Sequence, residues 1–241
     1  MKVVKQGTSE GDSDRDWLPS GLPLLKESEK SDLSTAQLVK LFFILVVELG
    51  IGVLLAVGAL AASERYAIFS GRTSNPGVAL DVIQKFELEY LYIALVILGR
   101  TVSWVNMYPM VVWKQRVMHM KAGNLRANMQ IFKMIGDGAG SNAIVLETEG
   151  DVGGYNRANR SLTHMVENMA AVLVLMLAVG FVYPLLACLF TTLWCFGRVS
   201  HQMGYATGGY GKHGAGFGLS AIASGALQGL CCLIVWKTIL R

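Results

Sequence analysis

The chain has 241 residues, of which 53% are hydrophobic and only 16% charged, and its mean hydropathy is +0.44. A soluble domain typically carries about 25% charged residues, so the composition excludes an ordinary water-soluble domain and indicates lipid around much of the chain. The net charge of +4 is modest. Its basic residues gather in one loop rather than on an aromatic-rich face, which indicates membrane orientation and not nucleic-acid binding.

The first 35 residues are polar and rich in Asp, Glu, Lys and Ser. They contain no apolar stretch of the kind that a signal peptide requires, and the acidic run at residues 10–16 argues against a mitochondrial or plastid transit peptide. We predict a disordered, solvated tail at residues 1–35.

Five segments then provide the roughly 20 apolar residues that a helix needs to cross a bilayer core of about 30 Å. In chain order they are residues 38–62, 88–116, 158–180, 184–205 and 216–240. The sequence therefore predicts an all-α polytopic membrane helix bundle. Its expected divisions are the tail at 1–35, a first transmembrane helix at 36–62, a linker at 63–87 and a four-helix membrane domain at 88–241.

The loop between the second and third helices carries seven basic residues, compared with three in the linker between the first and second helices, and this excess places it in the cytosol. Five crossings then put the tail in the cytosol and the C-terminus across the membrane. The Asn159-Arg160-Ser161 sequon lies on the cytosolic side in this topology, so we expect it to be unused. The four cysteines lie in apolar runs without zinc-type spacing and are expected to be buried thiols; no metal site is predicted.

Two polar stripes interrupt the apolar pattern. Arg160, His164 and Glu167 share one face at the start of the third helix. Arg198, His201, Gln202 and Tyr205 form a stripe at the end of the fourth helix. Because these helices are joined by a short turn and run antiparallel, both stripes reach the same membrane face.

Charged groups at this depth are costly and usually turn toward a bundle interior or a wet cavity. Two simpler interpretations remain open: Arg160 and Glu167 form only a structural ion pair, and Arg198 only extends to the headgroups. Two converging stripes favour a polar ligand site. Two cations with one acid suit a small zwitterion with more carboxylates than amines, such as glutathione, whose carboxylates arginine pairs bidentately. A nearby cation or hydroxyl donor would favour its reactive thiolate.

The stripes resemble the MAPEG family of microsomal glutathione transferases, prostaglandin E and leukotriene-forming synthases and the lipoxygenase-activating protein. The family's Arg-Ala-x-x-Asn-x-x-Glu pattern is similar to the segment with Arg160, His164 and Glu167, followed by Asn168. Its Gly-Arg-Val-x-x-x-x-(Gly/Ala)-Tyr pattern matches Gly197-Arg198-Val199 with Gly204-Tyr205, and His201 falls where prostaglandin E synthase also has His.

The resemblance covers about residues 88–240. It implies a homotrimer of four-helix subunits that binds glutathione near the cytosolic face, between neighbouring subunits. The glutathione-binding residues it implies are Arg160, His164, Glu167, Asn168, Arg198, His201 and Tyr205. Lys212 or Tyr205 would stabilise the thiolate. The membrane would be that of the endoplasmic reticulum, with a plastid or other organelle membrane as the alternative.

The chain departs from the family pattern at several positions. The family's Asn is His164, a later Pro is Ala170, and the thiol-activating Arg of several members has only Lys212 and His213 nearby. The family also has an Arg near the end of its first helix, for which Arg116, Lys121 and Arg126 are in range. The helix at 36–62 has no family counterpart. Its Glu48 is a candidate partner for Arg100 in the next helix, and the alternative is that Arg100 faces another subunit.

Two functions follow. The leading hypothesis is a glutathione transferase or peroxidase that acts on lipophilic electrophiles or lipid hydroperoxides arriving from the bilayer. The alternative is a non-enzymatic MAPEG-like lipid-binding scaffold or a structural subunit of a membrane complex, which the substituted thiol position and the extra helix favour.

Overall fold

A computed structural model describes residues 35–70, 76–118, 125–135 and 143–240. The predicted tail at 1–35 lies almost wholly outside these residues. The described elements are α1 (Thr35–Ser70), α2 (Pro76–Lys85), α3 (Glu89–Tyr108), a π-helical turn (Pro109–Trp113), α4 (Lys114–Met118), β1 (Phe132–Ile135), β2 (Ala143–Leu146), α5 (Gly150–Gly180), α6 (Pro184–Gly208) and α7 (Gly214–Ile239).

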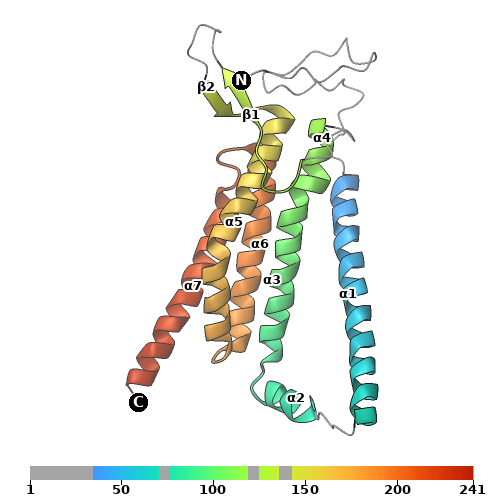
Figure 1. Cartoon of the computed structure of the whole chain (residues 1–241). Coiled ribbons are helices and arrows are strands. Elements are labelled where there is room, and N and C mark those ends of the chain that lie inside the picture. Colours follow the sequence, from blue (N-terminus) through green and yellow to red (C-terminus); the bar gives the residue numbers. More distant parts are fainter. Residues whose placement is uncertain (1–34, 71–75, 119–124, 136–142, 241) are drawn as a thin grey trace.

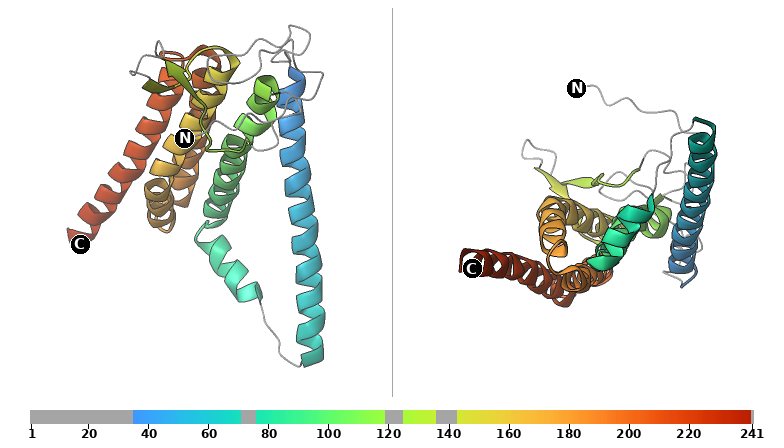
Figure 2. Two further views of the ribbon diagram at one scale, coloured as in Figure 1. Left: turned by 45° about the horizontal axis from the view of Figure 1, so that its top comes forward. Right: turned by 90° about the horizontal axis from the view of Figure 1, so that it is seen from below.

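The long helices run side by side along one axis (Figure 1). Helix α6 packs against α3, α5 and α7, and α1 lies beside α3 and the π-helical turn at the outer edge. The view from below shows α1 and α7 on opposite sides of the bundle (Figure 2). The short helix α2 joins the lower ends of α1 and α3, while α7 diverges from α5 and α6 toward its C-terminal end.

The chain is an integral membrane protein, as its composition predicted. Four described helical segments are long and apolar enough to cross a membrane: Thr35–Tyr66, Glu89–Trp113, Gly150–Gly180 and Gly214–Ile239. Helix α6, the remaining predicted crossing, is not among them because its second half carries Arg198, His201 and Gln202. These side chains are all buried against neighbouring helices, and α6 runs antiparallel to α5 through the same thickness (Figure 1).

Two glycines explain why α6 and α7 lie so close together. A Cβ atom on Gly197 would lie 2.7 Å from the backbone nitrogen of Ser220 and 2.9 Å from the carbonyl oxygen of Gly216. A Cβ on Gly216 would collide in turn with the backbone nitrogen of His201. The absence of both side chains lets the helix backbones touch, as small residues commonly do in membrane bundles.

Two helices extend well beyond their predicted bounds: α5 begins at Gly150, eight residues before the predicted position, and α1 continues to Ser70, eight residues past the predicted end at residue 62. The first turns of α5 are polar, so hydropathy did not reveal them, yet Asn156 and Asn159 there are almost completely buried. The buried amide of Asn159 is consistent with the prediction that the sequon is unused. The sequence also gave no indication of α2 within the linker or of the antiparallel β1–β2 pair.

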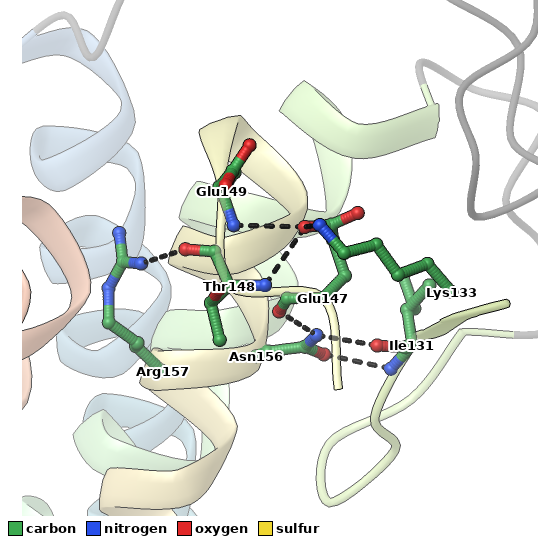
Figure 3. Close-up of polar contacts among 7 residues, drawn as sticks. All are labelled: Ile131, Lys133, Glu147, Thr148, Glu149, Asn156 and Arg157. Carbon is green, nitrogen blue, oxygen red and sulfur yellow. Dashed lines mark hydrogen bonds and ion pairs between the residues drawn. The ribbon is translucent and has the colours of Figure 1, made fainter. Parts of the chain in front are cut away.

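The Asn156 side chain attaches the β-hairpin to the bundle (Figure 3). Its Oδ1 accepts from the backbone N–H of Ile131 at 2.8 Å, and its Nδ2 donates to the carbonyls of Ile131 and Glu147, both at 2.7 Å. The buried Glu147 carboxylate accepts from the Lys133 ammonium at 3.1 Å and from the backbone N–H groups of Thr148 and Glu149. The polar residues that made the start of α5 hard to predict therefore hold the β1–β2 hairpin in place.

The expected pairing of Glu48 with Arg100 is confirmed. Arg100 Nη2 lies 2.8 Å from Glu48 Oε2 and equally far from the Ser103 hydroxyl, and Nη1 donates to the Leu45 carbonyl at 3.1 Å. The ion pair links α1 to α3 within the membrane-spanning segments, where a lone charge would be expensive.

Candidate functional site

The two polar stripes meet at one end of the bundle, as predicted. The first half of α5, the end of α6 and the start of α7 surround a pocket of about 310 Å³. The residues that line it are Arg160, His164, His201, Tyr205, Tyr210, His213 and Phe217. A single subunit thus forms a polar hollow where the sequence predicted that the stripes would converge.

Arg198 lies behind this pocket, with only 3% of its surface exposed. Its Nη1 and Nη2 each lie 3.1 Å from His164 Nδ1, and Nη2 also donates to the Ser161 carbonyl at 3.3 Å. Because arginine has only donors, His164 Nδ1 must accept, so this imidazole is neutral with its proton on Nε2. Among the described residues, no carboxylate lies within ion-pair distance of Arg198. The pocket therefore lies next to a buried positive charge that no acid in the described part of the chain compensates.

Aromatic rings form the rest of the pocket wall. The His201 ring lies 5.2 Å from that of His213 and 5.8 Å from that of His164. The Tyr205 ring lies 5.1 Å from His213 and meets it edge to face. The Nδ1 atoms of His201 and His213 are buried and have no hydrogen-bond partner among the described residues. Together these side chains can donate hydrogen bonds to an anionic ligand while excluding water from one side of it.

The α6–α7 turn brings His213 to the pocket. Gly209 and Gly211 have φ angles of 69° and 94°, which favour glycine. Gly204 lies so close to the Lys212 carbonyl that a Cβ there would collide with it. The glycines of the Gly-Arg-Val…Gly-Tyr pattern thus allow close packing of α6 against the chain that follows it, and this packing positions His213.

Arg157 fastens the same end of α6 to α5. Its Nε donates to the Tyr205 carbonyl at 2.9 Å, Nη2 to the Ala206 carbonyl at 3.1 Å and Nη1 to the Thr148 carbonyl at 2.7 Å. The last carbonyls of a helix lack partners within the helix and attract cations. In the sequence, Arg157 is one of the basic residues of the loop between the second and third predicted helices. Its position three residues before Arg160 did not distinguish this role.

A second hollow of about 260 Å³ adjoins the pocket on the side of the hairpin. It shares Arg160, Tyr205 and Tyr210 with the first hollow and adds Arg157 and Glu147. Burial alone would raise the pKa of Glu147, but the backbone N–H of Glu149 and the Lys133 ammonium outweigh it and hold this pKa below its ordinary value. Glu147 therefore remains charged, and it helps to hold the wall of the second hollow in place.

Besides Arg198, three predicted site residues lie outside the lining of either hollow. Glu167 is half exposed and lies 3.6 Å from Arg160. Asn168 is exposed and donates to the His164 carbonyl at 2.8 Å. Lys212 is exposed, and the stem of its side chain packs along Gly208. Of the two residues near the expected thiol-activating position, His213 lines the pocket and Lys212 does not.

Arg116, one of three candidates for the family's earlier arginine, lies 5.2 Å above the Trp113 ring and 3.3 Å from the Asp151 carboxylate. Arg126 is exposed, and its carbonyl accepts from the Tyr155 hydroxyl. Lys121 lies outside the described residues. Within the described part of the chain no cluster of three or more His, Cys, Asp or Glu side chains could hold a metal ion.

Fold and pocket together define a polytopic membrane helix bundle with a cationic, histidine-rich cavity at one end. The sequence profile of the MAPEG family matches residues 110–236, and the chain belongs to this family. Members of the family generally use glutathione and include transferases and synthases, although not every member is an enzyme. Among curated proteins and solved structures, none matches the chain.

Proposed function

We propose that this protein is a membrane-bound glutathione transferase or peroxidase that acts on lipophilic electrophiles or lipid hydroperoxides. The observation that carries the proposal is the charge of buried Arg198, which lies behind the pocket without a carboxylate partner among the described residues. Arg160 lines the pocket itself and adds a second cation. A site with two cations favours a ligand of net negative charge. Glutathione, with two carboxylates and one ammonium, has that charge.

The size and chemistry of the pocket support the same ligand. Its volume of about 310 Å³ is at the lower end of the range of about 300–1,000 Å³ that is typical of small-ligand sites. Arg160 would pair with a glutathione carboxylate. Glu167, 3.6 Å from Arg160, would receive the ammonium at the rim.

The reactive thiol requires a donor that stabilises its anion. We assign this role to the Tyr205 hydroxyl, because Tyr205 lines the pocket and no hydrogen bond of its hydroxyl to another described residue is present. A donor aimed at the sulfur favours the thiolate and lowers the thiol pKa. Lys212 remains the alternative donor, at an exposed position outside the lining.

In conjugation, the thiol proton passes to solvent, the sulfur forms a bond with the electrophilic carbon, and the leaving group departs with its electron pair. In peroxide reduction, the thiolate attacks the outer peroxide oxygen and releases a lipid alcohol after protonation. A second glutathione then displaces water from the oxidised sulfur and gives the disulfide. Both reactions need only glutathione and the lipophilic substrate.

The assembly and the membrane are part of the proposal. We expect a homotrimer in which a neighbouring subunit closes the open side of the pocket, in the membrane of the endoplasmic reticulum. The half-exposed state of Arg160 and Glu167 in a single subunit supports a ligand site that a second copy completes.

Calorimetry of glutathione binding to the full chain in detergent, together with conjugation of a chlorodinitrobenzene, tests the proposal. Arg160→Ala should weaken binding about tenfold or more, because it removes a charged hydrogen-bond donor. Arg65→Ala, at an exposed position on α1, is the matched control and should change nothing. No binding by wild-type protein, or equal binding by Arg160→Ala, would overturn the assignment.

A second candidate is a non-enzymatic lipid-binding scaffold or a structural subunit of a membrane complex. The observation that favours it is the engagement of both terminal nitrogens of Arg198 by His164 and Ser161. This guanidinium can act on a ligand through its charge, but its two terminal nitrogens already have hydrogen-bond partners within the protein. Glutathione binding without turnover of any electrophile or hydroperoxide would select this candidate.

A further inference from the structure

The extra helix α1 creates a third hollow, separate from the cationic pocket and from the hollow beside the hairpin. A groove of about 400 Å³ lies between α1 and α3. Its walls are almost entirely apolar, and α6 contributes Val199. Phe42, Val46 and Val96 line it and expose half or more of their surface at the outside of the bundle. Because all three lie in membrane-spanning segments, the groove opens toward lipid chains and not toward water.

One charged spot interrupts this groove, whose lining also includes the polar atoms of Thr101 and Trp104. Arg100 is the charged residue in its lining, and Glu48, its partner at 2.8 Å, leaves 54% of its side chain exposed. Only Oε2 of this carboxylate has a partner among the described residues. A carboxylate that faces hydrocarbon with one oxygen unsatisfied is costly. A ligand that supplies one O–H donor would remove this cost.

The depth of the spot limits which lipid can supply that donor. Arg100 is the twelfth of the 25 residues in the span Glu89–Trp113, and Glu48 is the fourteenth of 32 in Thr35–Tyr66. Both therefore lie near the middle of their spans. Headgroup oxygens are then about 15 Å away, half the thickness of the hydrocarbon core. The donor must belong to the chain of a lipid and not to its headgroup.

The charge at the spot limits the donor further. Arg100 and Glu48 together are neutral, so an added carboxylate or phosphate would bring an unpaired charge into low dielectric, where it is strongly disfavoured. A hydroxyl or hydroperoxyl group is uncharged, donates one hydrogen bond and accepts another. It can donate to Glu48 and accept from Arg100.

We propose that the groove between α1 and α3 binds a single acyl chain that carries a hydroxyl or hydroperoxyl group near its middle, with the Glu48–Arg100 pair as the polar recognition element. The volume suits a ligand of this class, since sites for small molecules span about 300–1,000 Å³. The groove contacts α6 through Val199, next to Arg198, so only the width of α6 separates it from the cationic pocket. The site requires no thiol chemistry and does not rest on the proposed enzyme function.

The full chain in phosphatidylcholine nanodiscs, without glutathione, provides the test. A diazirine-bearing methyl ester of a long-chain hydroxy acid, hydroxylated near mid-chain, is photocrosslinked, and labelled peptides are identified by mass spectrometry. Labels are expected on α1 and α3 around the groove. Unlabelled methyl hydroxystearate with a mid-chain hydroxyl should compete about tenfold better than methyl stearate, as one hydrogen bond to a charged group would give. The isomer hydroxylated next to the ester should compete no better than methyl stearate.

One pair of variants and one double variant separate recognition from folding. Val46→Trp fills the groove and should abolish labelling, whereas Val57→Trp, at a 59% exposed position of the same helix outside the lining, should leave it intact. The double variant Glu48→Leu with Arg100→Leu removes both charges together, a change that proteins commonly tolerate. It should still be labelled but should lose the preference for the hydroxylated competitor.

Equal competition by methyl stearate and its mid-chain hydroxylated derivative would overturn the proposal. So would labelling that Val46→Trp does not reduce. If Val46→Trp changes the oligomeric state on size exclusion while wild-type protein takes up no label, a second copy of the chain covers the groove, and the lipid assignment is wrong. Failure of glutathione binding would leave all of these outcomes unchanged.

Discussion

Two arginines in membrane-embedded helices, Arg198 and Arg100, show how differently the bundle treats a buried charge. Arg100 has a carboxylate partner at 2.8 Å, so its charge is cancelled locally and links α1 to α3. Arg198 has an imidazole nitrogen and a carbonyl as its partners and is more deeply buried. Its charge is solvated by the protein but not cancelled. A compensated pair stabilises structure, whereas an uncompensated charge next to a cavity attracts an anion.

Among the substitutions that test this difference between the two arginines, Arg198→Met should have the largest effect on activity. The substitution removes the uncompensated charge and leaves His164 without its donors, so we expect glutathione-dependent kcat/KM to fall about 100-fold, in line with the loss of one member of a buried charged contact. Steady-state kinetics with a chlorodinitrobenzene measures the effect. Arg198→Lys, which keeps the charge but not the fork, should recover part of the activity; equal loss in both variants would indicate that shape and not charge matters.

Glu48→Gln tests the compensated arginine. Arg100 would then keep its charge without a counter-charge, and we expect a loss of about 2 kcal/mol of stability, less than the 3–5 kcal/mol of fully buried pairs because Glu48 is half exposed. Thermal unfolding in detergent should show the loss of stability. The kcat/KM of the folded variant should stay within about twofold of wild type, which corresponds to a change in activation free energy below about 0.4 kcal/mol. A large fall in activity of folded protein would contradict the division between the two arginines.

Tyr205→Phe tests whether the Tyr205 hydroxyl is the donor that stabilises the thiolate in the pocket. Removing the hydroxyl leaves the ring packing against His213 but takes away the donor assigned to the sulfur. We expect kcat to fall about tenfold with little change in KM, and the rate to require a higher pH because the bound thiol is less acidic. A pH–rate profile that matches wild type would remove Tyr205 from the catalytic role.

Glu147→Gln tests the support around the pocket and has a defined pH dependence. The pKa of Glu147 is held below its ordinary value of 4.5, so its charged form contributes stability above that value. This contribution is lost as pH falls through the lower folded-state pKa. The variant should be about 1 kcal/mol less stable than wild type at pH 7, and thermal unfolding should show this gap closing at pH values well below 4.5. A gap that persists there would mean that the carboxylate charge is not the cause.

Lys212→Ala should have the smallest effect. Because Lys212 is exposed and does not line the pocket, we expect kcat and kcat/KM within about twofold of wild type, a change below about 0.4 kcal/mol. His213→Ala provides the contrast at the next residue, which does line the pocket, and should lower kcat/KM more. A severe loss in Lys212→Ala alone would reverse the choice between Tyr205 and Lys212.

The membrane helices could be predicted from the sequence, because long apolar runs have few alternatives to a helix across lipid. The meeting of the two polar stripes could also be predicted, because helical spacing and one short turn fix their faces and their ends. Which members of the stripes reach the cavity depends on how the helices pack. Arg198 lies behind His164, and Glu167 and Lys212 lie outside the lining, because helix crossing angles and the glycine-dependent approach of α7 set those orientations.

The start of α5 shows the same division. Asn156 and Arg157 precede the helix predicted at 158–180 and fall in the polar loop before it, because hydropathy cannot distinguish a solvated amide from one that holds a hairpin. Their structural roles depend on distant partners: Asn156 bonds to Ile131, 25 residues away, and Arg157 bonds to Tyr205, 48 residues away. Contacts over that separation arise only when the helices have packed, since neither residue pattern nor spacing specifies them.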